Sequence, residues 1–299
     1  MKNTKDLKNI GTENSNKNSR NLHKKSILEI IKIINKEDSK ISKYLFKEKK
    51  DIEKAINLCV YAISKGNRVF YIGAGTSGRL GVLDASEMPP TFGVDKDTTF
   101  IGVIAGGDNA LRNPIEGAED DSKQVIKDLA KYKFNKNDVL IGISASGRTP
   151  YVVGGIKYAN SIGSKTISIA TSYNSEIGEL ANVGIDVNVG AEVVTGSTRM
   201  KSGTAQKMLL NIISTATMIK LGKVYDNLMI NVRTSNEKLK VRAISIVQKV
   251  TGLENENAIK DKLEESNWIT PVAIAMIKFN LTLEEAKKLI EDRNWIMKL

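Results

Sequence analysis

Short apolar runs that alternate with helical patterns are the feature that most limits how this chain can fold. Strands that are apolar on both faces are typical of a parallel sheet that helices cover on both sides. The chain is therefore predicted to be an α/β protein with a doubly wound, mostly parallel sheet. The predicted strands are residues 68–73, 99–107, 138–144, 165–171 and 184–190.

Helical patterns fill the intervals between these runs and extend beyond them. Two helices are expected before the first strand, and Gly66 is expected to end the second of them. After about Tyr225 the alternation stops and only helical patterns remain. Thr282 and Glu285 have the spacing of a capping box at the start of the last helix. The predicted helices are residues 26–35, 38–64, 77–87, 117–132, 150–163, 175–181, 202–222, 235–252, 255–266, 271–280 and 282–294.

These patterns predict three parts of the chain. Residues 1–45 comprise a polar, extended arm, rich in Asn and Lys up to residue 24, and the first helix. Residues 46–236 carry the alternating strands and helices, and residues 237–299 form a small helical domain. A chain of 299 residues is long enough for one large domain with a sizeable core and a small second one.

The composition argues against several classes of partner and cofactor. The net charge of +11 comes from lysines interspersed with acids, without a basic run that contains aromatic residues, so nucleic acid is not an expected partner. No apolar run approaches the ~18 residues of a membrane span, and the N-terminus lacks the apolar core of a secretory signal. One cysteine, Cys59, and one histidine, His23, rule out a disulfide framework and argue against a His/Cys metal site. We therefore expect a cytoplasmic protein.

Gly73, Gly75 and Gly78 form a G-x-G-x-x-G pattern between the first predicted strand and the next helix. In dinucleotide-binding proteins this pattern lets a pyrophosphate reach the amides of a helix N-terminus. The acid that would bind the ribose should end the next strand, but Asp108 lies roughly ten residues too far along. The same loop carries Thr76 and Ser77, whose hydroxyls can donate to a phosphate. The loop is therefore predicted to hold a different phosphorylated ligand.

Two further polar segments follow later strands. Ser144, Ser146 and Thr149 occur in SASGRT, directly after the third predicted strand, and residues 195–207, which include Lys201, open the long helix. Helix capping and turn formation can explain any one of these segments. Several of them at the carboxyl ends of strands in one sheet converge on the same crevice. That convergence favours a site for a small phosphorylated molecule.

SASGRT resembles the phosphate loop of sugar isomerase (SIS) domains, which bind phosphosugars, so residues 46–236 are expected to be such a domain. The match to the family of N-acetylmuramic acid 6-phosphate etherases is closer, and simple SIS isomerases lack its DASE and GSTRMK blocks. The resemblance runs from about Thr12 into the C-terminal helices. His23 stands where the family pattern has an Asp. The blocks that carry it are YIGAGTSGRLGVLDASEMPPTFG, IAGGDNAL, EGAEDD, GISASGRTPYV, GAEVVTGSTRMKSGTAQKMLLN and NLMINVRTSNEKL.

The resemblance implies that the substrate is N-acetylmuramic acid 6-phosphate. The family cleaves its lactyl ether without a cofactor, giving N-acetylglucosamine 6-phosphate and D-lactate. Elimination from the ring-opened sugar needs one base, which removes the C2 proton, and one acid, which protonates the departing lactyl oxygen. Neither step requires a metal or a redox cofactor.

Three glutamates are candidates for these two roles. Glu87 closes a predicted helix, whose negative end favours a protonated acid, whereas Glu116 and Glu119 are expected at a helix start, which favours an ionised base. Each could also be an ordinary surface glutamate at a helix end. The family's acidic positions fall on Glu87, as proton donor, and on Glu119, with Glu116 implied as a hydroxyl-binding neighbour. The predicted substrate ligands are Thr76, Ser77, Glu116, Ser144, Ser146, Thr149 and Lys201.

Two other functions fit the same fold. An aldose–ketose isomerase would also use a base at C2, but the DASE block and the second acidic block argue against it. A sugar-phosphate sensor without enzymatic activity would bind phosphosugar without turnover, and the C-terminal helices could then be its partner module. They lack a basic recognition face, which argues against DNA binding.

The spacing between Ser77 and Glu87 bears on the oligomeric state. On one continuous helix these residues lie about 15 Å apart, which is more than a hexose phosphate spans. Either the helix breaks early, at Gly81, or Glu87 serves the phosphate site of a neighbouring subunit. Relatives that resemble SIS domains are commonly dimers, so we expect a homodimer.

Overall fold

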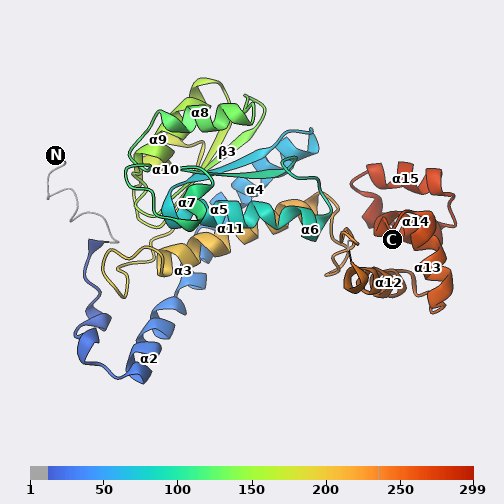
Figure 1. Cartoon of the computed structure of the whole chain (residues 1–299), viewed down its shortest axis with the longest axis horizontal. Helices are drawn as coiled ribbons and strands as arrows, with labels where there is room; N and C mark the ends of the chain where they lie inside the picture. The colour runs from blue at the N-terminus through green and yellow to red at the C-terminus, as the bar shows by residue number, and fades with distance from the viewer. Residues whose placement is uncertain (1–12, 235) are drawn as a thin grey trace. The chain divides into compact units, whose positions relative to one another are not determined.

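The chain divides into two compact units in the computed structural model, which describes residues 13–234 and 236–299 (Figure 1). Unit 1 combines the described residues up to Ser86 with Asp97–Ser214. Unit 2 combines Glu87–Lys96 with Thr215–Leu299. The sequence analysis gave no sign that a segment before the second strand groups with the C-terminal helices. The predicted division at residues 45 and 236 stays a prediction.

Unit 1 contains a sheet of five parallel strands in the order β2-β1-β3-β4-β5. Each strand falls within or at the edge of a predicted apolar run, and the expected doubly wound α/β fold is confirmed. Most strand residues are buried, as both faces of the sheet are covered. The strands are β1 (Val69–Gly73), β2 (Phe100–Ile104), β3 (Val139–Ser144), β4 (Lys165–Ala170) and β5 (Val183–Asp186).

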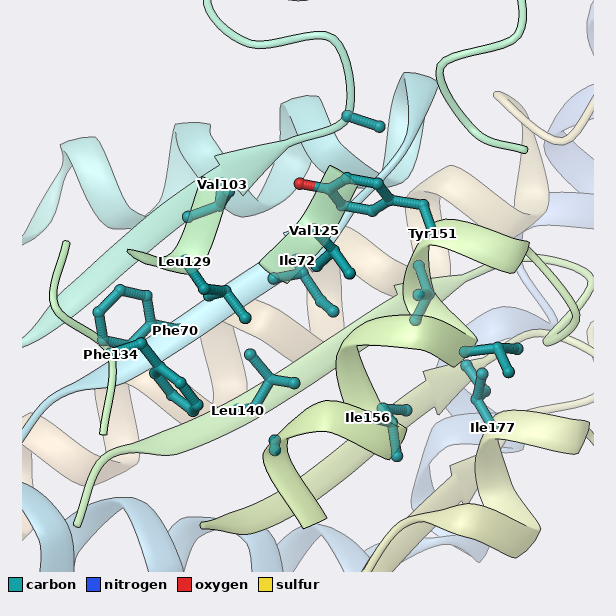
Figure 2. Packing of buried hydrophobic residues seen from close by; sticks show 14 of the residues in the cluster. Phe70, Ile72, Val103, Val125, Leu129, Phe134, Leu140, Tyr151, Ile156 and Ile177 are labelled. Carbon is teal, nitrogen blue, oxygen red and sulfur yellow. The ribbon is translucent and has the colours of Figure 1, made fainter. Parts of the chain in front are cut away.

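Alternate strand residues of unit 1 face opposite helical layers. Phe70 and Ile72 of β1 pack with Leu129 and Ile156 against one face of the sheet, in a core that α8, α9 and α10 cover (Figures 1 and 2). Tyr71 points the other way, toward α5, where a Cβ added to Gly81 would lie 2.9 Å from the Tyr71 Cβ. The helices of unit 1 are α2 (Ile27–Asp38), α3 (Ile41–Lys47), α4 (Lys49–Ser64), α5 (Gly75–Ser86), α7 (Asn109–Arg112), α8 (Gln124–Lys131), α9 (Pro150–Ser161), α10 (Glu176–Leu180) and α11 (Lys201–Lys220), whose last residues belong to unit 2.

The N-terminal part differs from its prediction in two respects. The expected helix 38–64 is two helices, α3 and α4, which meet at Glu48, where φ is −88° and ψ is 13°. The described part of the expected extended arm contains the short 3-10 helices η2 (Lys17–Ser19) and η3 (Leu22–Lys24). Asn16 of the arm is buried, and the side-chain amides of Asn16 and Asn18 donate to the carboxylate of Glu37 in α2. Residues 1–12 lie outside the described residues.

Unit 2 is a helical unit with its own core. Ile230, Val247, Ile259 and Trp295 belong to one cluster of buried side chains. The predicted capping box is confirmed, since the Thr282 hydroxyl accepts from the Glu285 amide and the Glu285 carboxylate accepts from the Thr282 amide. The helices of unit 2 are α6 (Met88–Phe92), α12 (Glu237–Thr251), α13 (Glu256–Glu265), α14 (Thr270–Phe279), α15 (Leu283–Glu291) and the 3-10 helix η4 (Trp295–Lys298).

Candidate active site

The carboxyl ends of β1 and β3 lie side by side and lead into the first two hydroxyl-rich segments, the first turn of α5 and the loop 144–149. Gly73 in the last position of β1 aligns with Ile143 of β3. In a sheet of this order the winding reverses between these two strands, and ligands of such folds bind outside the carboxyl ends at that point. The topology therefore places Thr76 and Ser77 and the loop 144–149 at one edge of the sheet. Thr76 and Ser77 lie in the first turn of α5, which begins at Gly75, and not in a loop as predicted.

The loop 144–149 is a cluster of hydroxyl groups held by a left-handed glycine. The Ser144 Oγ lies 2.8 Å from the Thr149 Oγ1 and 3.4 Å from the Ser146 Oγ, and it accepts from the Gly147 amide at 3.0 Å. Gly147 has φ +70°, and a Cβ there would come within 2.2 Å of the Ser175 Cβ, so only glycine fits this turn. The hydroxyls bond to one another and accept from the amides of Gly147 and Arg148, which leaves donor and acceptor capacity for a ligand.

Helix α9 starts directly after this loop. Thr149 is its N-cap residue, but its side chain makes no capping bond, and Pro150 is the first helical residue. The next amide, of Tyr151, donates to the backbone carbonyl of Glu119 at 3.0 Å. The segment that carries Glu119 is thus fastened beside the hydroxyl loop, although the two are far apart in sequence.

Glu116 and Glu119 do not stand at a helix start, which corrects the prediction. Helix α8 begins only at Gln124. Residues 116–120 form turns, in which Gly117 adopts a φ of +73°. Asp121 takes the role of helix cap, because its carboxylate accepts from the amides of residues 123 and 124 at 2.9 and 3.0 Å. Both glutamates are exposed. The helix dipole therefore gives no reason to make Glu119 the base.

Ser77 is already hydrogen-bonded within the protein. Its hydroxyl donates to the Gln206 Oε1 of α11 at 2.9 Å, and both residues are buried. The Gln206 Nε2 is a buried donor without a hydrogen-bond partner among the described residues. Gln206 thus brings an N–H donor without a partner to the first turn of α5. The sequence analysis missed it, since a glutamine inside a helical pattern carries no mark of this contact.

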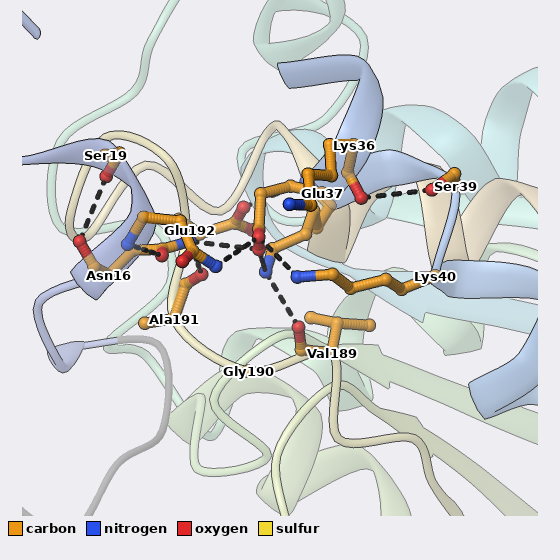
Figure 3. A network of polar contacts seen from close by, with 12 residues as sticks. Asn16, Ser19, Lys36, Glu37, Ser39, Lys40, Val189, Gly190, Ala191 and Glu192 are labelled. Atoms are coloured by element: carbon orange, nitrogen blue, oxygen red, sulfur yellow. Dashed lines mark hydrogen bonds and ion pairs between the residues drawn. The ribbon is translucent and has the colours of Figure 1, made fainter. Parts of the chain in front are cut away.

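Lys201 belongs to a buried network at the start of α11, where its ammonium donates to the Glu37 carboxylate at 2.8 Å and to the Val189 carbonyl at 2.9 Å. Asn16 and Lys40 also bond to Glu37 (Figure 3). Burial raises the pKa of Glu37, but the hydrogen bonds from Lys201 and Lys40 outweigh it and hold the pKa at about 2. The predicted contact of Lys201 with substrate stays a prediction, and in this structure its charge is paired inside the protein.

Glu192 completes this network as a cap on α11. Its carboxylate is fully buried and accepts from the backbone amides of Lys201 and Ser202 at 3.0 and 2.9 Å. An anion at the positive end of a helix is favourable, so the carboxylate occupies the position that a ligand anion would otherwise take. The third polar segment of the sequence is therefore used, at least at its first helical turn, for internal bonds.

Glu87 follows directly after α5, which runs from Gly75 to Ser86 without a break at Gly81. The alternative in which the helix breaks at Gly81 is therefore wrong. Glu87 is also the N-cap residue of α6, and its backbone carbonyl accepts from the Thr91 amide at 3.2 Å. It stands between the negative end of one helix and the positive end of another, which weakens the helix-end argument for a protonated acid. Its side chain is exposed.

Asp84 holds the last turn of α5 in place. Its buried carboxylate accepts from the Tyr71 hydroxyl at 3.0 Å, from Asn211 at 2.7 Å and from Ser214 at 3.1 Å. Burial raises the pKa of Asp84, although these hydrogen bonds favour its ionised form. The first residue of the DASE block thus anchors α5 to β1 and α11, just before Glu87. The sequence analysis noted the block but not this role.

The described residues contain no group of three or more His, Cys, Asp or Glu side chains arranged to hold a metal ion. Within the same residues, no helix combines the length and the apolar character needed to cross a membrane.

Comparisons with known proteins match SIS domain models and N-acetylmuramic acid 6-phosphate etherases. Residues 51–160 match the model of the glucokinase regulatory protein N-terminal SIS domain, and residues 124–216 match the SIS domain model. The chain is 49% identical over 288 residues to an N-acetylmuramic acid 6-phosphate etherase of Clostridium botulinum (strain Loch Maree / Type A3), a match that covers 96% of this chain and 94% of the relative. N-acetylmuramic acid 6-phosphate etherase 1 of Bacillus licheniformis is 49% identical, with coverages of 95% and 93%. The etherase of Clostridium beijerinckii is 49% identical, with coverages of 98% and 96%.

Proposed function

Because this chain belongs to the N-acetylmuramic acid 6-phosphate etherase family, we propose that it cleaves the D-lactyl ether of N-acetylmuramic acid 6-phosphate. The products are N-acetylglucosamine 6-phosphate and D-lactate. The observation that carries this function is the 49% identity to named etherases over nearly the whole of both chains. The hydroxyl loops at the switch point of the sheet agree with a phosphorylated substrate.

The chemistry is elimination followed by addition of water. In the ring-opened sugar, the C1 aldehyde makes the C2 proton acidic enough for a carboxylate to remove. The lactyl oxygen on C3 is β to the resulting carbanion, and it leaves once an acid protonates it. Water then adds to C3 of the unsaturated aldehyde. A positioned base and a positioned acid each contribute roughly 10²–10⁴-fold to such a rate.

The phosphate of the substrate binds at the hydroxyl loops. Ser144, Ser146 and Thr149 supply hydroxyls beside the N-terminus of α9, whose positive end favours an anion even though its Tyr151 amide bonds to the Glu119 carbonyl. Thr76 and Ser77 contribute from the first turn of α5, where Ser77 acts through its bond to Gln206.

Glu119 is the base and Glu87 is the proton donor, with Glu116 as a neighbour that binds a sugar hydroxyl. The backbone bond between Glu119 and the first turn of α9 supports the role of Glu119, since it fixes that carboxylate's backbone close to the phosphate loop. The family resemblance supports the role of Glu87, and the anchoring of α5 by Asp84 favours a defined position for it.

We further propose that the protein is a homodimer in which Glu87 acts on substrate held by the partner subunit. An unbroken α5 supports this, since ten residues of helix from Ser77 to Glu87 span about 15 Å. The exposed apolar side chains of α2 also favour an interface with another copy, because Ile27, Leu28 and Ile31 are 79%, 59% and 56% exposed.

Mixed dimers test the arrangement across the subunits. Glu87→Ala chains and Glu119→Ala chains, each inactive alone, are unfolded and refolded together. Random pairing makes half of the dimers mixed, and each mixed dimer regains one intact site, so activity should recover to about a quarter of wild type. A mixture that stays inactive while subunits demonstrably exchange would assign both glutamates to one chain's site.

Release of D-lactate tests the function itself. In the presence of EDTA, the purified protein should release D-lactate from N-acetylmuramic acid 6-phosphate and not from the unphosphorylated sugar, because the phosphate provides the binding energy. Glucosamine 6-phosphate and fructose 6-phosphate serve as controls for an isomerase. Turnover of these without lactate release would favour the isomerase, and binding of phosphosugars without any turnover would favour a sensor. The proposed reaction takes place in the cytoplasm, with neither nucleic acid nor a membrane as partner.

A further inference from the structure

Unit 2 contains a pocket of its own, which the proposed etherase mechanism does not use. Its volume is about 360 Å³, and it is lined by the residue that ends α6, by residues 231–234 and by residues 267–271 at the start of α14. Arg233 is the only charged residue among those that line it. The pocket therefore has a cationic side chain and no lining carboxylate.

The backbone around Gly93 shapes one wall of this pocket. Gly93 ends α6 with φ +66°, and a Cβ at this position would lie 2.4 Å from the carbonyl oxygen of Asn231. Both the left-handed conformation and this close approach require glycine. Arg233 is fixed nearby, since its Nη2 donates to the Val94 carbonyl at 2.6 Å and to Asp95 at 2.8 Å. These bonds use one nitrogen of a guanidinium that carries five N–H donors.

Thr270 provides a second polar group that points to a ligand. It lines the pocket, its side chain is buried with 1% of its surface exposed, and its Oγ1 has no hydrogen-bond partner among the described residues. A buried hydroxyl without a partner costs stability, and such groups call for an explanation. Thr270 is also the first residue of α14, a ten-residue helix, so the hydroxyl lies at the positive end of a helix.

Trp268 adds an aromatic surface to the same pocket. It is half-buried, and the Lys240 ammonium lies 5.2 Å from its ring centroid. Trp268 has a φ of 59°, in the left-handed region that bulky residues rarely adopt, whereas Asn267, with a φ of 52°, is of a type that adopts it more readily. Strained backbone of this kind persists where the surrounding structure enforces it, often at ligand sites.

We propose that this pocket binds a small organic anion, a phosphate monoester or carboxylate on a carbon skeleton. The anionic group lies between the Arg233 guanidinium and the Thr270 hydroxyl at the start of α14, and the carbon skeleton lies against Trp268. The exposed ion pair between Arg233 and Asp95 is weak enough for an anion to compete with it. Helix α6 ends at this pocket and begins directly after Glu87, so a helix of five residues separates the pocket from the proposed proton donor in the chain.

The test is a titration of the full-length protein, read by tryptophan fluorescence and by calorimetry, with inorganic phosphate, D-lactate and N-acetylglucosamine 6-phosphate. These probes separate a phosphate from a carboxylate as the recognised group. Thr270→Val removes only the hydroxyl and keeps the side chain's shape. Thr217→Val is the matched control, since Thr217 is also fully buried with an unpartnered Oγ1 but does not line the pocket.

Thr270→Val should weaken binding of at least one probe about tenfold or more, whereas Thr217→Val should leave it unchanged. Both variants should melt at or above the wild-type temperature, because each removes an unpartnered buried hydroxyl. Arg233→Gln should weaken the same probe. Ser146→Ala should weaken calorimetric binding of N-acetylglucosamine 6-phosphate at the phosphate loop but leave the tryptophan fluorescence change intact, since both tryptophans, Trp268 and Trp295, belong to unit 2. The absence of a tryptophan fluorescence change with all three probes, or an equal fluorescence titration of wild type and Thr270→Val, would overturn the proposal.

Discussion

Two polar clusters in unit 1 differ in what their polar groups bond to. The hydroxyl cluster of Ser144, Ser146 and Thr149 is uncharged, and its hydroxyls bond to one another and to the amides of nearby loop residues. The ion-pair network around Glu37 and Lys201 is charged and buried, and its members bond to several protein groups each. Both arise from polar stretches that look alike in the sequence, yet only the first retains bonding capacity for a ligand.

The difference follows from the energetics of burial. A buried charge without a partner costs far more than a pair, so the lysine and glutamate of the network can stay buried only while they hold each other. A hydroxyl can exchange one partner for another at little cost, because it both donates and accepts. We therefore infer that the ion-pair network stabilises the fold, whereas the hydroxyl cluster binds substrate.

Replacing the exposed carboxylates of Glu119 and Glu87 should have the largest effect, and it should lower the reaction rate without changing stability. Glu119→Gln and Glu87→Gln should each lower D-lactate release roughly 10²–10⁴-fold, because each removes a proton-transfer group. The melting temperature should stay near that of wild type, since both side chains are exposed. Asp120→Asn, a change of the exposed acid next to Glu119, is the control and should retain activity. Near-normal lactate release by either glutamine variant would remove that residue from the mechanism.

Breaking the buried network should act on stability. Lys201→Met should lower the free energy of unfolding by about 3–5 kcal/mol, because it leaves the buried Glu37 carboxylate without its closest fully buried cation. Lys54→Met is the control, since Lys54 makes an exposed pair with Asp51 at the same 2.8 Å, and it should cost about 0–1 kcal/mol. Denaturant unfolding measures both. An unchanged free energy of unfolding in Lys201→Met would mean that Lys201 does not stabilise the fold. It could then bind substrate, and the two clusters would no longer differ in role.

Ser146→Ala should weaken N-acetylglucosamine 6-phosphate binding by about 1.5–3 kcal/mol, the value of one hydrogen bond to a charged group. Calorimetry measures the change. Ser161→Ala is the control at the far end of α9, where the hydroxyl donates to the Tyr158 carbonyl. An unchanged affinity for Ser146→Ala would remove the hydroxyl cluster from the site.

The pH dependence of stability should sharpen the same contrast. The pKa of Glu37 is lowered from its ordinary value of 4.5 to about 2, so its ionised form stabilises the folded state above pH 4.5. That contribution should be lost as the pH falls from about 4.5 toward 2. Urea unfolding at a series of pH values should show a shallower loss over this range in Lys201→Met than in wild type. Parallel curves would mean that Lys201 does not set the pKa of Glu37.

Much of the fold could be predicted because its signals are local. Apolar runs marked each strand, and the spacing of Thr282 and Glu285 marked a capping box. The helix predicted for 117–132 starts late because Gly117 adopts a positive φ and Asp121 bonds to nearby amides, which competes with helix formation. The helical pattern of residues 38–64 also predicted one helix, whereas the structure has two, α3 and α4, which meet at Glu48.

The site was predictable only in part, since its decisive contacts join distant residues. The two hydroxyl loops could be placed at one edge because parallel strands bring their carboxyl ends together. Lys201 could not be recognised as the partner of Glu37, which lies 164 residues earlier. The bond between Ser77 and Gln206 and the anchoring of Asp84 by α11 are also long-range. No periodicity in the sequence records such pairs.

The central claim is that two glutamates divide the proton transfers of one elimination. The direct measurement is NMR of C2 proton exchange into deuterated water, alongside D-lactate release, for the two glutamine variants. Glu119→Gln should lose both exchange and lactate release, because the base is gone. Glu87→Gln should lose lactate release yet keep some exchange, because only the leaving oxygen lacks its proton. The reverse pattern would exchange the two roles, and exchange that persists at the wild-type rate in both variants would contradict the account.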